Sequence, residues 1–536
     1  MHSKIFSSST EGVDAYTVEV ETDIQQQLPA FCTVGLPDGA VRESKERVTA
    51  AIKNSDFVFP SKRITVNLAP ADIRKEGAAF DLPIAVGILA ATGQILKDSF
   101  DDYVLLGELS LDGKVRPIPG ALPMALHFVD NNRKSGDRSS GKVDVAGGGS
   151  CNNGKNGIKG VIVPKENARE AAMAQGAPVY PVESLREVIS FLEDSSTIAP
   201  FEIDIEQVFA QRQEYPVDFA EVKGQESAKR ALEVAAAGGH NIILIGPPGS
   251  GKTMLARRLP TILPDMTLDE AIETTKIHSV AGLLPDDTAL IATRPFRSPH
   301  HTISNAGLIG GGSIPKPGDV SLAHNGVLFL DEVGEFRRDV LEVLRQPMED
   351  GIVTLSRALT TLTYPCRLML AAAMNPCPCG FFGDQNNSCN CTSGQIQKYM
   401  SRISGPLLDR IDIHITVPAV KFKEIASNRT EESSESIRLR VNEARQRQLK
   451  RFEHEKALYC NAGMTSKSIR AYCPVDDQCQ GLLKTAIQRQ GLSARAYDRI
   501  LKVSRTIADL AGSENIQLEH VAEAVHYRTL DRSLWL

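Results

Sequence analysis

The chain of 536 residues lacks the long apolar runs that mark a membrane protein. No run approaches the roughly 20 apolar residues that a helix needs to cross a bilayer, and the first residues lack the apolar core of a secretory signal. The composition, 42% hydrophobic and 24% charged, is ordinary for a soluble globular protein. We therefore expect a cytoplasmic protein without a membrane partner, and the length predicts about three or four domains.

The chain also lacks an excess of basic residues. Its formal net charge is −6, so the surface as a whole does not attract nucleic acid. Any contact with DNA must come from local basic clusters, such as loops that line a pore. The sequence contains no fixed-period internal repeat.

The cysteines do not indicate a disulfide scaffold, because ten in a chain of this length are too few. Four of them form two C-x-C pairs: Cys377, Cys379, Cys389 and Cys391. Four thiolates can hold a tetrahedral zinc ion. The C-x-C spacing is tighter than the common C-x-x-C, so free or redox-active thiols remain the alternative.

A glycine-rich segment lies between a strand-like apolar run at 241–245 and a helical pattern at 254–259. It reads Gly246-Pro247-Pro248-Gly249-Ser250-Gly251-Lys252-Thr253 and fits the phosphate loop G-x-x-x-x-G-K-[ST]. Glycines let backbone N–H groups turn toward a phosphate, and the helix N-terminus adds positive potential. We predict an ATP site in which Lys252 reaches the β/γ-phosphates and Thr253 holds Mg²⁺. A chance glycine-rich turn is the alternative.

A second apolar strand, residues 326–330, ends in the two carboxylates Asp331 and Glu332. Ligands of open α/β sheets bind at the carboxyl ends of the strands. We expect Asp331 to act through Mg²⁺ and its waters, and Glu332 to orient and deprotonate the attacking water. The alternative is an ordinary acidic end of a strand.

Two further polar residues belong to the expected site. A third strand, residues 367–372, leads to Asn375, whose amide can hold the lytic water or touch the γ-phosphate, unless it lies in an ordinary surface loop. Arg410 precedes an alternating strand at 411–417. It is either structural or an arginine finger that reaches a neighbour's γ-phosphate, where charge develops in the transition state. Spacing alone does not choose between these roles.

Composition and patterning divide the chain into four parts. Residues 1–200 alternate strand-like and helix-like patterns, interrupted at 131–158 by a Gly-, Ser- and Asn-rich flexible insertion that cannot bury a core. A linker at 201–216 precedes a nucleotide-binding unit at 217–418, and residues 419–536 are rich in helical patterns. The predicted fold class is α/β.

These segments together resemble an AAA+ ATPase, and more specifically the magnesium-chelatase-like YifB/ComM family of bacterial proteins. The resemblance rests on the phosphate loop, on Leu330-Asp331-Glu332, on residues 373–380 and on residues 407–412, and it covers nearly the whole chain apart from the insertion. It implies a central αβα sandwich with the P-loop, a C-terminal helical lid, and an N-terminal α+β domain like that of Lon protease.

The resemblance also implies roles for single residues. Asn375 matches the sensor-1 residue, and Arg410 matches the finger that acts in trans. Residues 491–496 are similar to the sensor-2 segment, so Arg495 would contact the γ-phosphate from the lid; a solvated helix arginine is the alternative. A finger in trans requires a ring of subunits, so a homo-oligomer, a hexamer, is implied, although the sequence itself does not show one.

Two inserts distinguish this branch of ATPases. One contains residues 294–301 and 310–312, and the other, residues 351–363, alternates on both sides of a turn-like tip and predicts a hairpin. In related ring helicases such inserts face the pore, where sequence-independent phosphate contacts are expected. The candidates for DNA contact are Arg357 at the tip, Arg294, Arg297 and Lys316, with the basic helix over 436–451 as a further one. The alternatives are packing of the insert between subunits and, for the helix, a solvated face.

The N-terminal segments at 74–81 and 107–115 resemble the Lon protease domain. Active Lon domains use a Ser–Lys pair, but the matching positions here hold Ala79 and Leu122. Without a hydroxyl nucleophile and its amine base, peptide hydrolysis by that route is not available. We therefore expect a binding or assembly module.

The expected function is that of an ATP-hydrolysing ring motor that acts on DNA, of the branch-migration helicase type linked to natural transformation and recombination. The alternative is a chelatase-like ATPase that remodels a protein partner or assists metal insertion. The sequence has no obvious metal-sensing D-x-S-x-S segment of the kind that chelatase partner subunits carry.

Overall fold

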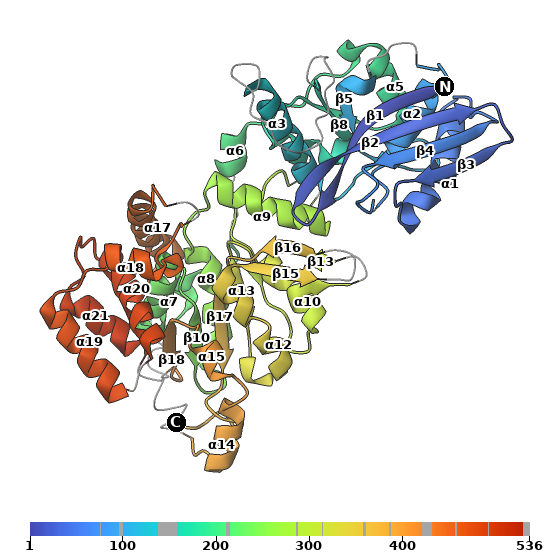
Figure 1. Ribbon diagram of the computed structural model, residues 1–536. Helices are drawn as coiled ribbons and strands as arrows, with labels where there is room; N and C mark the ends of the chain where they lie inside the picture. Colours follow the sequence, from blue (N-terminus) through green and yellow to red (C-terminus); the bar gives the residue numbers. More distant parts are fainter. Residues whose placement is uncertain are drawn as a thin grey trace. The chain divides into compact units, whose positions relative to one another are not determined.

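The computed structural model describes residues 1–75, 77–95, 100–137, 158–210, 215–285, 288–312, 315–356, 361–384, 387–420, 431–455, 458–490 and 493–528. They form two compact units, coloured along the sequence in Figure 1. The N-terminal unit comprises Met1–Gln211 together with Ala271–Ile291, and the ATPase unit comprises Arg212–Glu270 and Ala292–Leu536. Across these described ranges, no helix combines the length and the apolar character needed to cross a membrane.

The N-terminal unit is built on a seven-stranded mixed sheet of order β3-β4-β2-β1-β5-β8-β9. Its strands are β1 (His2–Glu11), β2 (Asp14–Gln25), β3 (Ala30–Val34), β4 (Arg63–Ala69), β5 (Tyr103–Leu105), β8 (Gly160–Pro164) and β9 (Val179–Val182), with a separate hairpin of β6 (Glu108–Leu109) and β7 (Val115–Arg116). The longest pair, β1 and β2, runs antiparallel with Ile5 opposite Val20. Alternate residues of β2 are buried, which is the pattern of a strand with one face on a core.

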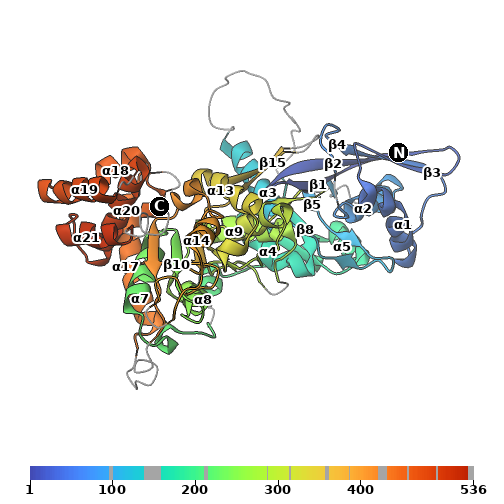
Figure 2. The ribbon, with the colours of Figure 1, turned by 90° about the horizontal axis from the view of Figure 1, so that it is seen from below.

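Helices cover this sheet. They are α1 (Gly39–Asn54), α2 (Asp81–Ala91), α3 (Ala121–Asp137), α4 (Ala168–Ala172) and α5 (Leu185–Glu193), followed by α6 (Ile205–Ala210). Nearly every residue of α2 is buried, as expected for a helix that is apolar on all sides. Figure 2 shows α1, α2 and α5 along one side of the strands.

The segment Ala271–Ile291 lies in the N-terminal unit although the phosphate loop precedes it in sequence. It contains most of α9 (Leu268–Ala281), whose buried Ser279 donates a hydrogen bond to the carboxylate of Glu170. That carboxylate also accepts the backbone N–H of Leu122 at 2.8 Å and a side-chain N–H of Asn167 at 3.2 Å. Burial raises the pKa of Glu170, because no cation lies among these partners to offset the loss of water.

The ATPase unit contains a five-stranded parallel sheet of order β11-β14-β17-β10-β18. The strands are β10 (Ile242–Ile245), β11 (Phe296–Arg297), β14 (Val327–Leu330), β17 (Met369–Met374) and β18 (Ile413–Thr416). All residues of β10, β14 and β17 are buried, which is typical of parallel strands covered on both faces. The register places Ile243 between Ala372 and His414.

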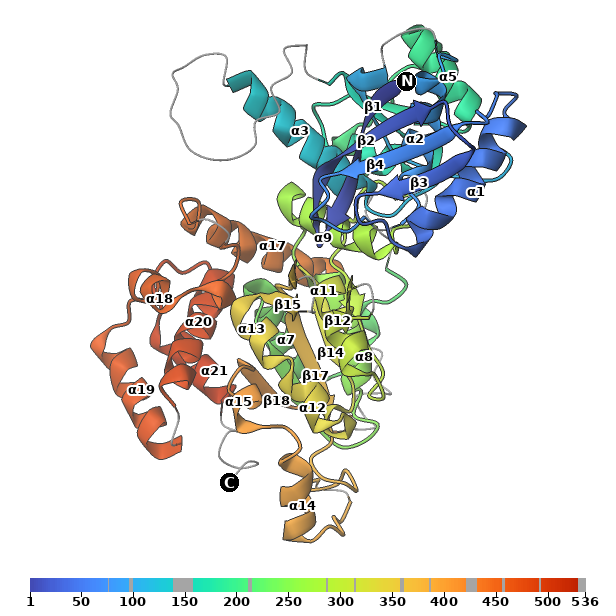
Figure 3. The ribbon, with the colours of Figure 1, turned by 45° about the vertical axis from the view of Figure 1, so that its right-hand side comes forward.

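The sheet is flanked by helices of the same unit, seen in Figure 3. They are α7 (Glu226–Gly238), α8 (Lys252–Ile262), α10 (Asn305–Ile309), α11 (Asp319–Leu322), α12 (Arg338–Glu342), α13 (Arg345–Asp350), α14 (Ser393–Met400) and α15 (Gly405–Leu408). Two short hairpins, β12 (Gly310–Gly311) with β13 (Lys316–Pro317) and β15 (Ile352–Ser356) with β16 (Thr361–Pro365), complete the core.

The C-terminal part of this unit is helical: α17 (Ser434–Arg451), α18 (Ser466–Tyr472), α19 (Asp477–Gln490), α20 (Ala494–Leu510) and α21 (Leu518–His526). A single hydrophobic cluster joins these helices to the sheet and to α7 and α8. Buried Asp509 anchors them through ion pairs with Arg451 and Arg505 and a hydrogen bond from Asn461 at 2.9 Å. The lid therefore packs as part of the ATPase unit.

The predicted α/β fold class and its strands are confirmed, and so is the hairpin before the sensor-1 strand, in which Leu355 lies opposite Leu362. The tip of that hairpin, which carries Arg357, lies outside the described residues. The predicted start of the flexible insertion, residue 131, is wrong, because residues 131–137 continue helix α3. The rest of it, 138–157, is also outside the described residues.

The Ser279–Glu170 contact yields a stability prediction. Ser279→Val and Ser279→Thr introduce side chains of nearly equal volume, but only threonine retains the hydroxyl. The valine variant should destabilise the N-terminal unit by about 1–3 kcal/mol relative to the threonine variant, because a buried carboxylate loses a donor.

The deficit should also depend on pH. The raised pKa of Glu170 means that the unfolding free energy falls as pH rises through that pKa, and removal of the hydroxyl raises the pKa further. The difference between the two variants should therefore be larger at pH 8 than at pH 5. Hydrogen exchange of peptides from residues 121–137 and 271–285 measures it, and equal protection in the two variants would refute the role of this bond.

Candidate functional site

The phosphate loop joins β10 to helix α8, which begins at Lys252. The half-buried ammonium of Lys252 donates to the carbonyl oxygens of Gly246 at 2.8 Å and Pro247 at 2.9 Å. Burial lowers the pKa of Lys252, and the charges of Asp331 and Glu332 act in the opposite direction. The loop thus holds a partly desolvated cation at the N-terminus of a helix, which is an arrangement suited to a phosphate.

Two parallel strands, β10 and β14, bring the expected magnesium ligands together at their carboxyl ends. The hydroxyl of Thr253 donates to a carboxylate oxygen of Asp331 at 2.8 Å, although 77 residues separate them in the sequence. Asp331 follows β14, and the adjacent Glu332 is exposed with a left-handed backbone, φ 50°. A hydroxyl and a carboxylate on one face are ligands that Mg²⁺ accepts.

Asn375 directly follows β17, the strand between β14 and β10. Its side-chain oxygen lies 3.2 Å from the ammonium of Lys252. The structure therefore brings Lys252, Thr253, Asp331 and Asn375 to one edge of the sheet, where their strands end.

Arg410 lies at the opposite end of the strands of the same sheet, the end at which they begin, just before β18. Its side chain is 9% exposed and pairs with Glu349 of α13, while one Nη donates to the carbonyl of Pro406 at 2.8 Å. Burial lowers the pKa of Arg410, and the positive charges of Arg495 and Arg345 add to this effect. Its Nε is buried without a hydrogen-bond partner.

Arg495 lies beside Arg410 rather than beside the phosphate loop. It is in the first turn of α20, is 61% exposed, and approaches Glu349 at 4.0 Å. The four residues of β18, at about 3.3 Å each, separate the two edges by about 13 Å. Arg410 and Arg495 thus lie at the end of the sheet opposite the phosphate loop of their own chain.

A cavity of about 650 Å³ lies at this second edge, between the start of the strands and the lid helices. Arg410, Arg495 and Arg499 line it together with Glu349 and Asp412. Arg499 of α20 pairs with buried Asp412, two residues after Arg410. Burial opposes the charge of Asp412, but Arg499 and His240 outweigh it and hold the pKa of that carboxyl below its ordinary value.

Sequence reasoning missed two residues of these sites. Gln225, with φ 60°, donates from its side chain to the carbonyl of Ser250 in the phosphate loop. A Gly-Gln pair just before a helix is the only local signal for it. Glu349 joins Arg410 and Arg495, and nothing in its sequence context marks it.

The four clustered cysteines converge in space. Their sulfur atoms all lie within 4.8 Å of one another, and the closest pairs are Cys377–Cys379 at 3.3 Å and Cys379–Cys389 at 3.5 Å. A tetrahedral zinc with Zn–S bonds of about 2.3 Å places its sulfurs about 3.8 Å apart. The backbone N–H of Phe382 also points to the Cys377 sulfur at 3.3 Å, as it would to a thiolate.

Several of the basic residues proposed to contact DNA have partners inside the chain. Arg294 is 9% exposed, pairs with Glu270 at 2.9 Å and donates to three backbone carbonyls, so the structure removes it from the set that can grip phosphates. Arg297 pairs with Asp319 but is 38% exposed, and Lys316 is exposed. In the basic helix α17, the arginines with intramolecular partners are Arg440, Arg445, Arg447 and Arg451.

His300 and His301 of the first insert pack ring to ring, with centroids 4.1 Å apart. In the N-terminal unit, Ala79 is half-buried and Leu122 is fully buried. The carbonyl of Ala79 accepts from Gly107 at 3.1 Å, and neither side chain can act as a nucleophile or a base.

Comparison with known proteins agrees with this architecture. The family described as "Magnesium chelatase, subunit ChlI" matches residues 218–425. The family "Subunit ChlI of Mg-chelatase" matches residues 20–135, and "Magnesium chelatase, subunit ChlI C-terminal" matches residues 431–528.

Relatives of similar length extend the match to the full chain. The protein YifB of Escherichia coli K12 is 41% identical over 98% of this chain and 96% of its own length. Competence protein ComM of Haemophilus influenzae is 41% identical over 99% and 98%. Lon protease 2 of Bacillus subtilis is 34% identical over 157 residues, 27% of each chain. The chain therefore belongs to the YifB/ComM family of magnesium-chelatase-like AAA+ ATPases that carry a Lon-protease-like N-terminal domain.

Proposed function

We propose that this protein hydrolyses ATP at seams between identical subunits of a ring. One observation carries the proposal: the phosphate loop with Asp331 lies at one edge of the parallel sheet, and Arg410 with Arg495 lies at the other. Both arginines lie at the end of the strands opposite the phosphate loop, about 13 Å away along β18, which supports a site completed by a second copy. A hexamer is the ring that the family resemblance implies.

The proposed roles follow from the positions of the side chains. Lys252 neutralises the β/γ-phosphates, Thr253 and Asp331 hold Mg²⁺, and Glu332 activates water. Asn375, which contacts Lys252, orients the γ-phosphate or the water. Arg410 and Arg495 of the adjacent subunit stabilise the charge that develops on the transferred phosphate. Glu349 is the acidic partner that holds these two arginines until a phosphate replaces it.

We further propose that ATP turnover drives movement along DNA during recombination of incoming DNA. The support is the 41% identity to a relative named competence protein ComM and the exposed basic residues Arg297 and Lys316 of the inserts. Contacts of this kind grip phosphates and are independent of sequence. A chelatase-like ATPase that remodels a protein partner or assists metal insertion is the alternative, and the matches to ChlI families support it.

We also propose that Cys377, Cys379, Cys389 and Cys391 hold one zinc ion. The convergence of the four sulfur atoms supports it, as does the N–H of Phe382 that points to one of them. Zinc bound by four thiolates has no open coordination position, so its role is structural rather than catalytic.

The seam is tested by complementation between inactive variants. Lys252→Ala removes the phosphate contact of a subunit, and Arg410→Ala removes the finger that it offers to its neighbour. Each variant alone should have little ATPase activity. In an equimolar mixture roughly a quarter of random seams combine an intact loop with an intact finger, so activity should return toward that fraction.

A matched control is a mixture of Lys252→Ala with Glu332→Gln. Both changes damage the same half of the site, so this mixture should stay inactive. The rescue also shows that the mixed subunits are folded. Absence of rescue by Arg410→Ala, with both variants folded and assembled, would contradict a shared site.

DNA contact is tested by the salt dependence of binding. Binding of a branched DNA should weaken steeply with salt, and Arg357→Ala should lower the slope of log K against log[salt] by about 1. Lys467→Ala, which changes an exposed lysine of α18, is the control and should leave the slope unchanged. Fluorescence anisotropy at a series of salt concentrations measures both. An unchanged slope for Arg357→Ala would exclude that arginine from the interface.

A further inference from the structure

We propose that the four-cysteine cluster is a metal-closed clamp that holds the phosphate loop, Asn375 and the Glu332 loop in their working positions. This inference rests on the proposed ATPase function and goes beyond a structural zinc site. It assigns the metal a defined effect on nucleotide binding and hydrolysis, although the metal touches neither nucleotide nor water.

The N-terminal end of the cysteine segment is attached to the nucleotide site. Cys377 comes two residues after Asn375, whose amide contacts Lys252 at 3.2 Å. Three residues further on, Gly380 packs directly on the phosphate loop. A Cβ at Gly380 would lie 2.5 Å from Cδ of Pro248, so the Gly380 backbone and the Pro248 ring are closer than a side chain at position 380 allows.

The C-terminal end of the segment is attached to the Glu332 loop. Thr392, next to Cys391, caps α14 and forms a reciprocal capping box with Gln395. At the far end of this helix, the buried ring of Tyr399 packs on Gly334, where a Cβ would lie 2.9 Å from the ring. Just beyond the helix, Arg402 donates to the Gly334 carbonyl at 2.7 Å. The helix is therefore fastened two residues after Glu332.

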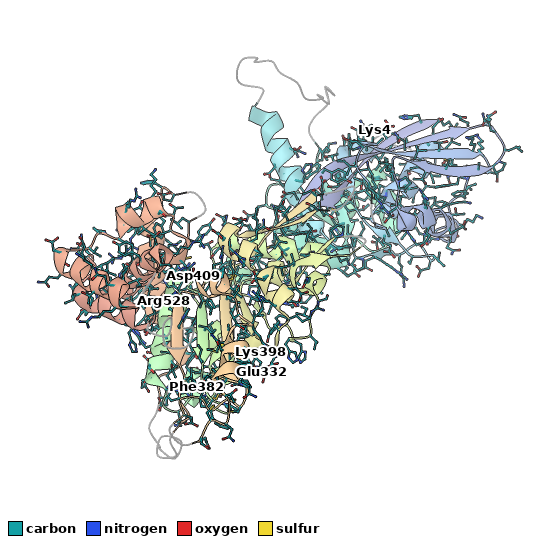
Figure 4. All side chains as sticks on the ribbon, turned by 60° about the horizontal axis from the view of Figure 1, so that its bottom comes forward. Lys4, Glu332, Phe382, Lys398, Asp409 and Arg528 are labelled. Atoms are coloured by element: carbon teal, nitrogen blue, oxygen red, sulfur yellow. The ribbon has the colours of Figure 1, made fainter. Side chains whose placement is uncertain are left out.

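The two attachments converge as well. Burial raises the pKa of Tyr399 to about 12, and the backbone of Asn375 acts against that rise, which places the phenol beside the sensor-1 position. Figure 4 labels the parts concerned: Phe382 in the cysteine loop, Lys398 on α14, and Glu332. The segment from Cys377 to Tyr399 thus spans the three elements that surround the nucleotide.

Between these attachments the segment has little regular structure of its own. In the described part of 377–391 there is no helix or strand, and only Cys377 and Gly380, with Pro376 before them, are buried. A metal that joins both C-x-C pairs removes most of the conformational freedom of this loop. Without the metal, Gly380 and α14 are free to move relative to each other, and the phosphate loop loses its support.

Alanine substitutions at two glycines can distinguish the proposed support of the phosphate loop from an effect of backbone strain alone. Gly380 and Gly383 have left-handed φ values of 86° and 80°. A Cβ at Gly380 meets Pro248, but one at Gly383 meets nothing within 4 Å. Gly380→Ala and Gly383→Ala therefore impose similar strain, and only the first pushes the cysteine loop away from the phosphate loop.

We expect both alanine variants to retain one zinc per chain by elemental analysis. Gly380→Ala should bind a fluorescent ATP analogue at least tenfold more weakly than Gly383→Ala and should hydrolyse ATP more slowly. Equal affinity and equal turnover in the two variants would overturn the clamp.

Removal of the metal is the second arm of the test. Cys389→Ser should lose zinc and should show the weaker nucleotide binding of Gly380→Ala, whereas Cys32→Ser, a change at an exposed cysteine outside the cluster, should do neither. Zinc loss with unchanged nucleotide affinity would also overturn the proposal. Absence of zinc from the parent chain would do the same.

Failure of the proposed function gives a different result. If the parent chain binds the analogue but does not hydrolyse ATP even with DNA, the ATPase proposal fails. In that case the difference in nucleotide affinity between Gly380→Ala and Gly383→Ala still tests the clamp proposal.

Discussion

The parallel direction of the strands in the ATPase unit is the constraint on which the proposed site depends. Because β10, β14 and β17 all end at the same edge, residues far apart in the sequence meet there as Lys252, Asp331 and Asn375. Because β18 runs the same way, the arginine that precedes it must lie at the other edge. In the proposed mechanism a subunit with this sheet carries half of a site at each end of its strands, and this is the physical reason to propose a ring.

The second edge is held by charge rather than by apolar packing alone. Glu349 faces Arg410 and Arg495, and Asp412 pairs with Arg499 of the same lid helix. The lid helix α20 and Arg410 therefore share one network of ions around a cavity. Arg410 and Asp412 are buried, and buried charges are costly unless they are paired. A phosphate from a neighbour would replace Glu349 as the anion, so nucleotide binding and lid position are linked in the proposed mechanism.

The cysteine segment adds a third constraint to the first edge. It leaves the sheet at Asn375, packs on Pro248 through Gly380, and returns through α14 to Gly334. The three loops of the proposed nucleotide site are thus joined by a single stretch of chain. The segment 271–291 also links distant parts of the sequence. It lies between the phosphate loop and β14 along the chain but forms part of the N-terminal unit. Ser279 and Glu170 fix it there through a buried hydrogen bond.

Much of the fold followed from local sequence patterns. The apolar runs before Gly246, Asp331 and Asn375 predict buried strands, and all three are strands of one sheet. The hairpin at β15 and β16 follows from alternation. The sequence predicts an insertion that starts too early, because Asn and Lys residues at the end of α3 have the composition of a loop although the helix continues to Asp137. The sequence shows the charge of Arg294 but not its buried partner Glu270, which is 24 residues away, and therefore wrongly suggests a DNA contact.

The sequence by itself determined the phosphate loop, the paired carboxylates and the four clustered thiols, because each of these is a short motif whose chemistry depends on neighbouring residues. Only the tertiary structure decided that Arg495 lies with Arg410 and Glu349, that Gly380 packs against Pro248 of the phosphate loop, and that residues 271–291 belong to the N-terminal unit. These contacts join residues that are distant along the chain, and they depend on strand order, strand direction and burial. A local sequence pattern does not specify strand order, strand direction or burial.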